Sequence, residues 1–125
     1  MGLGFTELNA YKLAYEAAML VFELTKKFPK EETYSLTDQV RCSSRSVCAN
    51  ITEGYRKRLY PKYFSSKMID ADGECAETIV HLNFAKDCSY ITKSENEILL
   101  SKYQEVGRML GGMIANPEKF LSKKQ

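Results

Sequence analysis

The chain has 125 residues, a length typical of one domain, and its 18 basic and 16 acidic residues give a net charge of +2. A balance so close to neutral does not indicate nucleic-acid binding by itself, so the positions of the charges must decide. The composition, 44% hydrophobic and 27% charged, is that of an ordinary globular protein. Neither a signal-peptide pattern nor an apolar run long enough to cross a membrane occurs, which predicts a cytoplasmic protein with no membrane segment.

Four helices are predicted, over residues 6–27, 35–53, 61–89 and 94–116. The first begins at Thr6, a good N-cap residue, and ends at Phe28-Pro29 because the residue before a proline is disfavoured in a helix. Apolar residues at spacings of four, three and four predict its buried stripe. This stripe comprises Leu13, Ala17, Leu20 and Leu24.

The second helix is predicted to start at Ser35, because Ser35-Leu36-Thr37-Asp38 resembles a capping box. Gly54 is a natural stop for it. It is the least hydrophobic of the four helices. Its apolar face comprises Leu36, Val40, Val47 and Ile51, interrupted by the small residues Ser43 and Ser44.

The third helix starts at Pro61, where the missing N–H costs nothing, and Gly73 within it indicates a close approach to another helix. Its heptad stripe comprises Phe64, Met68, Ala71, Cys75, Thr78, Leu82 and Ala85. The fourth helix opens with a capping-box pattern at Ser94-Glu95-Asn96-Glu97 and closes at Asn116-Pro117. Its stripe comprises Leu99, Tyr103, Val106, Leu110 and Met113.

Four amphipathic helices joined by short connections predict an all-α, antiparallel up-and-down four-helix bundle. Short loops force neighbouring helices to run in opposite directions, and no segment alternates as a half-buried strand would. We expect one domain over residues 1–125.

No catalytic constellation can be assembled from this sequence. It has no phosphate-binding glycine loop, and His81 is its only histidine. Cys42, Cys48, Cys75 and Cys88 form no CxxC pair, which argues against a metal site. We therefore expect a protein that is not an enzyme and that has no cofactor and no metal.

Basic residues cluster between the second and third helices. The cluster comprises Arg41, Arg45, Arg56, Lys57, Arg58 and Lys62. Four aromatic residues are interleaved with its second half: Tyr55, Tyr60, Tyr63 and Phe64. Cationic groups beside aromatic rings favour contact with phosphates and unpaired bases. The alternative is a solvated connection whose aromatic rings pack onto the bundle.

Polar residues also form a seam on the second helix, where Gln39, Asn50 and Glu53 precede Gly54. Asn50 and Glu53 are three residues apart and can face the same neighbour. We interpret the seam as a structural network, either inside the bundle or across a subunit interface, that fixes helix register.

The sequence resembles a family of bacterial four-helix bundle proteins that are encoded by intervening sequences within 23S rRNA genes. The resemblance is carried by Phe28-Pro29, Glu32, Leu36-Thr37-Asp38-Gln39-Val40-Arg41, Ser46-Val47 and Ala49-Asn50-Ile51-Thr52-Glu53-Gly54, and by Ala71-Asp72-Gly73 with Glu77. The chain departs from the family pattern at Glu74, where serine is usual, and at Cys48, where proline is common.

This resemblance implies a cytoplasmic bacterial protein that forms a ring-shaped homopentamer. Related accessory proteins of diversity-generating retroelements bind nucleic acid and a reverse transcriptase through basic surfaces. Arg41, Arg45 and Arg56 match positions that are often basic in the family, and Asn50, Glu53 and Gly54 match its core motif. The leading hypothesis is a homo-oligomeric, RNA- or DNA-binding accessory protein. The alternative is a protein–protein scaffold that binds no nucleic acid.

Overall fold

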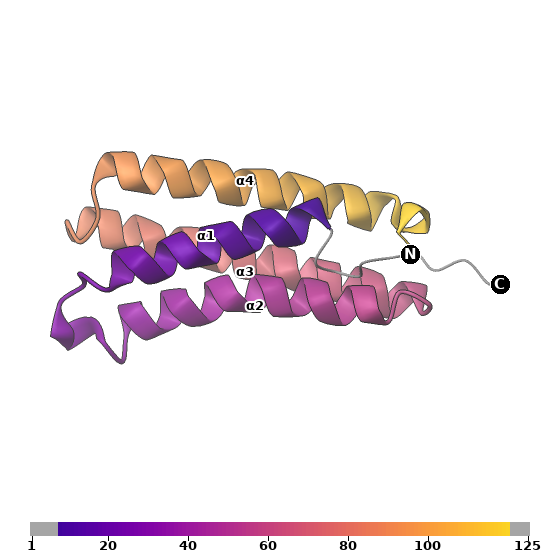
Figure 1. Cartoon of the computed structure of the whole chain (residues 1–125), viewed down its shortest axis with the longest axis horizontal. Helices are drawn as coiled ribbons and strands as arrows, with labels where there is room; N and C mark the ends of the chain where they lie inside the picture. The colour runs from indigo at the N-terminus through magenta and orange to yellow at the C-terminus, as the bar shows by residue number, and fades with distance from the viewer. Residues whose placement is uncertain (1–7, 121–125) are drawn as a thin grey trace.

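The computed structural model describes residues 8–120. Its long helices are α1 (Asn9–Thr25), α2 (Leu36–Arg56), α3 (Pro61–Asp87) and α4 (Lys93–Ala115), and two short 3₁₀ turns are η2 (Lys30–Glu32) and η3 (Pro117–Lys119). Successive long helices run in opposite directions (Figure 1). The all-α, antiparallel four-helix bundle predicted from the sequence is therefore confirmed.

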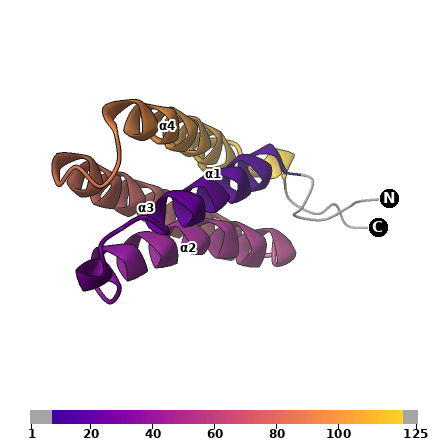
Figure 2. The same cartoon turned by 60° about the vertical axis from the view of Figure 1, so that its left-hand side comes forward.

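Each long helix packs against two others. α1 and α3 lie at opposite corners, and both contact α2 and α4 (Figures 1 and 2). One end of the bundle therefore holds the start of α1, the α2–α3 connection and the end of α4. The other end holds the α1–α2 and α3–α4 connections. This arrangement determines which charged residues can act together.

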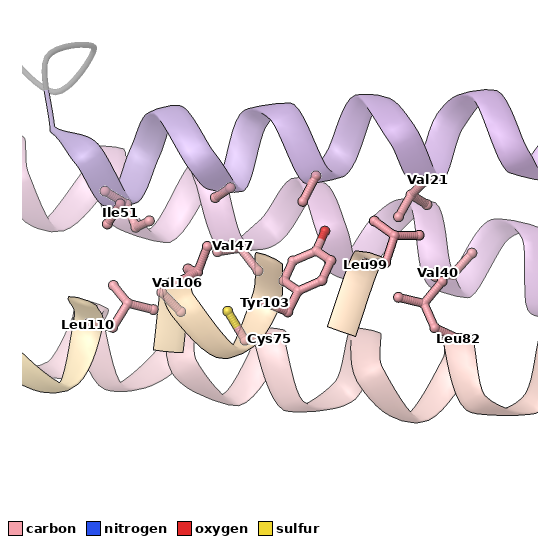
Figure 3. Packing of buried hydrophobic residues seen from close by; sticks show 14 of the residues in the cluster. Val21, Val40, Val47, Ile51, Cys75, Leu82, Leu99, Tyr103, Val106 and Leu110 are labelled. Atoms are coloured by element: carbon pink, nitrogen blue, oxygen red, sulfur yellow. The ribbon is translucent and has the colours of Figure 1, made fainter. Parts of the chain in front are cut away.

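The buried stripes predicted for α2, α3 and α4 are confirmed, since every residue assigned to them is buried (Figure 3). The stripe of α1 was misplaced by about one residue. Leu13, Leu20 and Leu24 lie half-buried at its edges. The residues that α1 buries are mostly small: Ala10, Ala14, Ala17, Val21 and Thr25. Helix α1 therefore presents small side chains to the middle of the core, and its larger leucines pack at the edges.

Helix α2 is capped differently from the prediction. The Ser35 side chain accepts no hydrogen bond from the helix backbone, so it does not form the predicted capping box. Instead, the Ser35 hydroxyl donates to Glu32 Oε1 at 2.6 Å, and the same oxygen accepts the Leu36 N–H at 3.2 Å. Glu32 Oε2 also accepts the Tyr90 hydroxyl at 2.8 Å. These three hydrogen bonds hold the pKa of Glu32 below its usual value.

Helix α4 has a capping box two residues earlier than predicted. Thr92 Oγ1 accepts the Glu95 N–H at 3.0 Å, and Glu95 Oε1 accepts the Thr92 N–H at 2.9 Å. Helix α1 begins at Asn9, and Thr6, its predicted cap, lies outside the described residues. The predicted start of α3 at Pro61 is confirmed.

Neither of the two glycines singled out from the sequence has its predicted role. Gly54 does not end α2, which continues to Arg56. It is buried against α3, where an added Cβ would lie 2.5 Å from Met68 Cε and 2.9 Å from Lys67 Cβ. Gly73, by contrast, has open space on the surface of α3. Gly54 is therefore the glycine that permits close helix packing, because only a residue without a Cβ fits there.

Candidate nucleic-acid interface

The six basic residues predicted as a nucleic-acid site divide into two groups. Arg41 and Arg45 lie in the first half of α2, whereas the other four lie at its end and at the start of α3. Arg41 and Arg56 are 15 residues apart on one helix, which separates them by about 22 Å. The sequence cluster is therefore not one surface patch.

Arg41 holds α1 against α2. Its Nε donates to Thr25 Oγ1 at 2.7 Å, and its terminal nitrogen donates to the Phe22 carbonyl at 3.4 Å. Its guanidinium also lies 4.8 Å from the centre of the Phe22 ring. These contacts direct the half-buried side chain toward the protein, so Arg41 has a structural role in this fold.

The remaining basic residues gather at the α2–α3 connection, which we call the basic end and define as Arg56, Lys57, Arg58 and Lys62. Arg56, Lys57 and Lys62 are exposed, and within residues 8–120 no carboxylate forms a salt bridge with any of them. Arg58 is more constrained. It donates to the Tyr55 carbonyl at 2.9 Å and lies 4.1 Å from the centre of the Tyr55 ring.

Of the four aromatic residues beside the basic end, two pack onto the protein and two lie on the surface, so each of the two interpretations of the sequence is correct for two rings. Phe64 is fully buried and stacks on Phe120 with 6.3 Å between ring centres, and Tyr55 is covered by Arg58. Tyr60 is 66% exposed, and Tyr63 is 37% exposed with Lys57 Nζ 5.0 Å from its ring centre. Two tyrosine rings thus lie on the surface beside three exposed cations.

The polar seam on α2 does not form a network inside the bundle. Gln39 is exposed, and the Asn50 side chain donates to the Ser46 carbonyl of its own helix at 2.9 Å. The Glu53 carboxylate forms a salt bridge with Lys67 on α3, with 2.9 Å between Oε1 and Nζ, and this contact raises the pKa of Lys67. The seam therefore lies at the surface, with one link to α3 next to Gly54.

A polar contact that the sequence analysis did not identify lies deeper in the core. The Thr78 hydroxyl lies 2.8 Å from Ser43 Oγ, and both residues are buried. Thr78 Oγ1 also lies 2.8 Å from the Glu74 carbonyl. The sequence signal was the presence of polar residues at one stripe position in each of two neighbouring helices. This contact joins α2 to α3 at a defined register.

The titratable groups of the described chain show no catalytic arrangement. His81 is mostly buried on α3, with Nε2 3.5 Å from Glu77 Oε2. Burial raises the pKa of the Cys48 thiol to about 11 and that of Cys75 to about 12, so neither is an activated nucleophile. Within residues 8–120, no three His, Cys, Asp or Glu side chains are grouped so that they could hold a metal ion. None of the described helices is long and apolar enough to span a membrane.

The fold and the basic end define a small four-helix bundle protein with a cationic, aromatic-bearing end. The chain belongs to the 23S rRNA-intervening sequence protein family, whose model matches residues 6–112. A solved structure from Bacteroides thetaiotaomicron, described as a protein with unknown function from the S23 ribosomal protein family, has the same fold. It is 24% identical, with a TM-score of 0.76 over 84% of this chain and 97% of that chain. No curated protein sequence matches this chain.

Proposed function

We propose that this protein is a non-enzymatic, homo-oligomeric nucleic-acid-binding protein that contacts RNA through its basic end. The observation that supports this proposal is the group of three exposed cations, Arg56, Lys57 and Lys62, that have no carboxylate partner among the described residues. Cations in this state can replace counterions on phosphates without first breaking a salt bridge.

The exposed rings of Tyr60 and Tyr63 lie beside these cations and can stack on unpaired bases. Stacking is tolerant of sequence because every base has a flat face. The contacts would therefore be electrostatic and stacking contacts, with little base readout.

Arg41 and Arg45 are not part of this interface in the proposal. Arg41 is engaged with α1, and Arg45 lies on the side of the bundle rather than at its end. The family description, 23S rRNA-intervening sequence protein, links these proteins to rRNA genes and is the reason for placing RNA first among the nucleic acids to test. A homopentameric state, a protein partner such as a reverse transcriptase and a cytoplasmic location complete the proposal, and these rest on the family resemblance.

The test is fluorescence anisotropy with a structured RNA and a matched duplex DNA at about 50 and 200 mM salt. The variant Arg56→Gln/Lys57→Gln/Lys62→Gln should bind at least tenfold more weakly at low salt. Its log–log salt slope should fall by about 2–3, as expected when three phosphate contacts are lost per bound chain. The control is Lys30→Gln/Lys93→Gln, which removes two exposed cations from the opposite end, and it is compared with the double variant Arg56→Gln/Lys57→Gln as well as with the triple variant. Equal losses in the two double variants would contradict the proposal.

A protein–protein scaffold is the second candidate, and an exposed apolar face supports it. On α3, Ile69, Val80 and Phe84 are all at least half exposed. If the unaltered protein binds neither nucleic acid at low salt, the scaffold becomes the better explanation.

A further inference from the structure

Helix α3 has two apolar faces, and the bundle covers only one of them. On the outer face, Ile69 is 56% exposed, Val80 50% and Phe84 59%. Gly73 and Ala76 lie between them and are also exposed. We call these five residues the outer stripe. Large exposed apolar side chains that line up on one helix are typical of an interaction surface.

The outer stripe lies opposite the core. Its residues follow one another at spacings of four, three, four and four, so they share one side of the helix. At 100° per residue, Gly73 lies on the far side of α3 from Leu82 and Phe64, which are buried in the core. The stripe is about 22 Å long, and its small central residues allow another helix to approach closely.

Acidic residues flank the outer stripe. Asp70 and Glu77 are exposed along one edge, and Asp72 is exposed along the other. Burial, together with the neighbouring carboxylates of Glu77 and Asp70, raises the pKa of Glu74 on the same side. A second α3 placed against this stripe would bring like charges together. The stripe therefore favours a partner surface that is apolar in the middle and basic at its rim.

The same chain carries such a surface between α1 and α2. A groove of about 310 Å³ is lined by Tyr11, Tyr15, Ala18, Met19, Phe22, Arg45 and Cys48. Tyr15 is 53% exposed and Met19 45% exposed. Lys26 Nζ, at one end of this groove, lies 4.8 Å from the centre of the Phe22 ring and is paired with Glu23 Oε1 at 3.3 Å. The groove is complementary to the outer stripe in apolarity, and the positive charge on its wall that faces outward is that of Arg45.

We propose that the outer stripe of one copy packs into the α1–α2 groove of the next copy. The inference rests on the homo-oligomeric part of the proposed function and names the two surfaces that would join the copies. Because these surfaces differ, the contact is head-to-tail, and each added copy leaves one stripe and one groove free until a ring closes. Arg45 then faces the carboxylates of Asp70 and Glu77 in the neighbouring copy.

The first experiment measures mass in solution by light scattering after size exclusion. Val80→Glu places a charge in the stripe, and Met19→Glu places one in the groove. Each variant should be a monomer, with an apparent dissociation constant for self-association raised at least tenfold. The matched control Ile98→Glu adds the same charge at a 55% exposed position on α4 and should leave assembly unchanged. Far-UV circular dichroism verifies that all three variants are folded.

Mixing the two monomeric variants distinguishes a head-to-tail contact between two different surfaces from a symmetric contact of one surface with itself. Val80→Glu keeps an intact groove and Met19→Glu an intact stripe, so together they should form a one-to-one dimer. The second test exchanges charges: Arg45→Glu should weaken assembly, and adding Asp70→Lys and Glu77→Lys should restore it. The inference is overturned if the unaltered protein is a monomer at about 100 μM, if Met19→Glu assembles normally, or if the mixture stays monomeric.

These outcomes are independent of the nucleic-acid test, because none of the substitutions touches the basic end. Assembly without RNA binding would leave the interface standing and remove the proposed binding activity. Salt-sensitive RNA binding by a monomeric protein would support the proposed binding activity and overturn the interface. A monomeric Val80→Glu protein should keep the salt slope per chain but lose the avidity of the assembly.

Discussion

Replacing Gly54 with alanine tests how closely α2 and α3 pack. An alanine Cβ at this position would lie 2.5 Å from Met68 Cε and 2.9 Å from Lys67 Cβ. Both distances are shorter than real Cβ atoms tolerate, so at least two neighbours must move. Met68 has a flexible end but is fully buried, and Lys67 Cβ is attached directly to the backbone of α3. The two helices must therefore separate slightly.

Two opposing effects set the size of the change. Glycine inside a helix costs about 1 kcal/mol relative to alanine, which Gly54→Ala recovers. Overpacking of a tight core costs about 1–3 kcal/mol, and a contact with backbone-anchored atoms belongs near the top of that range. The net expectation is a loss of about 1–2 kcal/mol in the free energy of unfolding. For a chain of this size, that corresponds to a Tm lowered by about 4–8 °C.

The assay is urea unfolding followed by far-UV circular dichroism, at several protein concentrations to separate assembly from folding. Gly111→Ala is the matched control, because Gly111 is inside α4 and an added Cβ there meets nothing within 4 Å. That variant should be more stable than the parent by up to about 1 kcal/mol. If Gly54→Ala is as stable as Gly111→Ala, the close packing of α2 on α3 does not exist as described.

Two further predictions concern residues that tie the connections and helices together. Glu32→Gln should lower the Tm at pH 7, because the carboxylate accepts hydrogen bonds from Ser35, Tyr90 and Leu36. Folding lowers the pKa of Glu32, so this stabilisation is present above about pH 4 and is lost as the pH falls through the folded-state pKa. The Tm values of the parent and of Glu32→Gln should therefore converge in thermal melts at low pH. Arg41→Ala should lower the free energy of unfolding by about 1–2 kcal/mol, because it removes the contacts with Thr25 and Phe22; urea unfolding measures this loss. The same variant should keep its RNA affinity within about twofold of the parent, as measured by fluorescence anisotropy. If Arg41→Ala is as stable as the parent but binds RNA more weakly, Arg41 belongs to the RNA-binding site instead.

The helices and most of the core followed from sequence periodicity because three of the four helices bury one strongly apolar stripe. In α2 and α4 a four-three spacing of apolar residues leaves one possible inward face. Helix α3 carries two such stripes, and the longer one, from Phe64 to Ala85, faces the core. In α1 the leucines and alanines form adjacent stripes, and the larger residues suggested the wrong one. Ala14 and Val21 lie at the centre instead. Which stripe faces inward depends on how near the neighbouring helices come, and that is a tertiary property.

Local signals at helix ends were correct in kind but displaced. The capping box at α4 uses Thr92 and Glu95 rather than Ser94, since both start points satisfy the pattern within two residues. At α2, Glu32 precedes the helix and engages Ser35 from outside it: the Glu32 side chain accepts the Ser35 hydroxyl at 2.6 Å, and the Glu32 carbonyl accepts the Ser35 N–H that a capping box would need at 3.0 Å. Gly54 could be read equally as a stop or as a packing residue. The two roles are distinguished only by the position of Met68, which follows 14 residues later on α3 and packs against Gly54.

The basic cluster shows why a site cannot be taken from spacing alone. Arg41 and Arg56 are close in sequence, yet the straight length of α2 places them far apart. Arg41 also differs from Arg56 in its environment, because Thr25 and Phe22 from α1 occupy its donors and its flat face. No pattern in α2 indicates that α1 will reach it. The basic end could be predicted because its residues are consecutive or nearly so.

The distribution of apolar residues connects the fold to assembly. Helix α1 contributes three alanines to the core, while its Tyr15 and Met19 remain exposed beside α2. Helix α3 likewise fills one face with buried residues and keeps Phe84 and Val80 outside. A bundle that only had to fold would place its larger apolar residues inside, because burial there stabilises most. Large apolar residues outside and alanines inside therefore favour a bundle whose outer surfaces are buried by contact with another molecule.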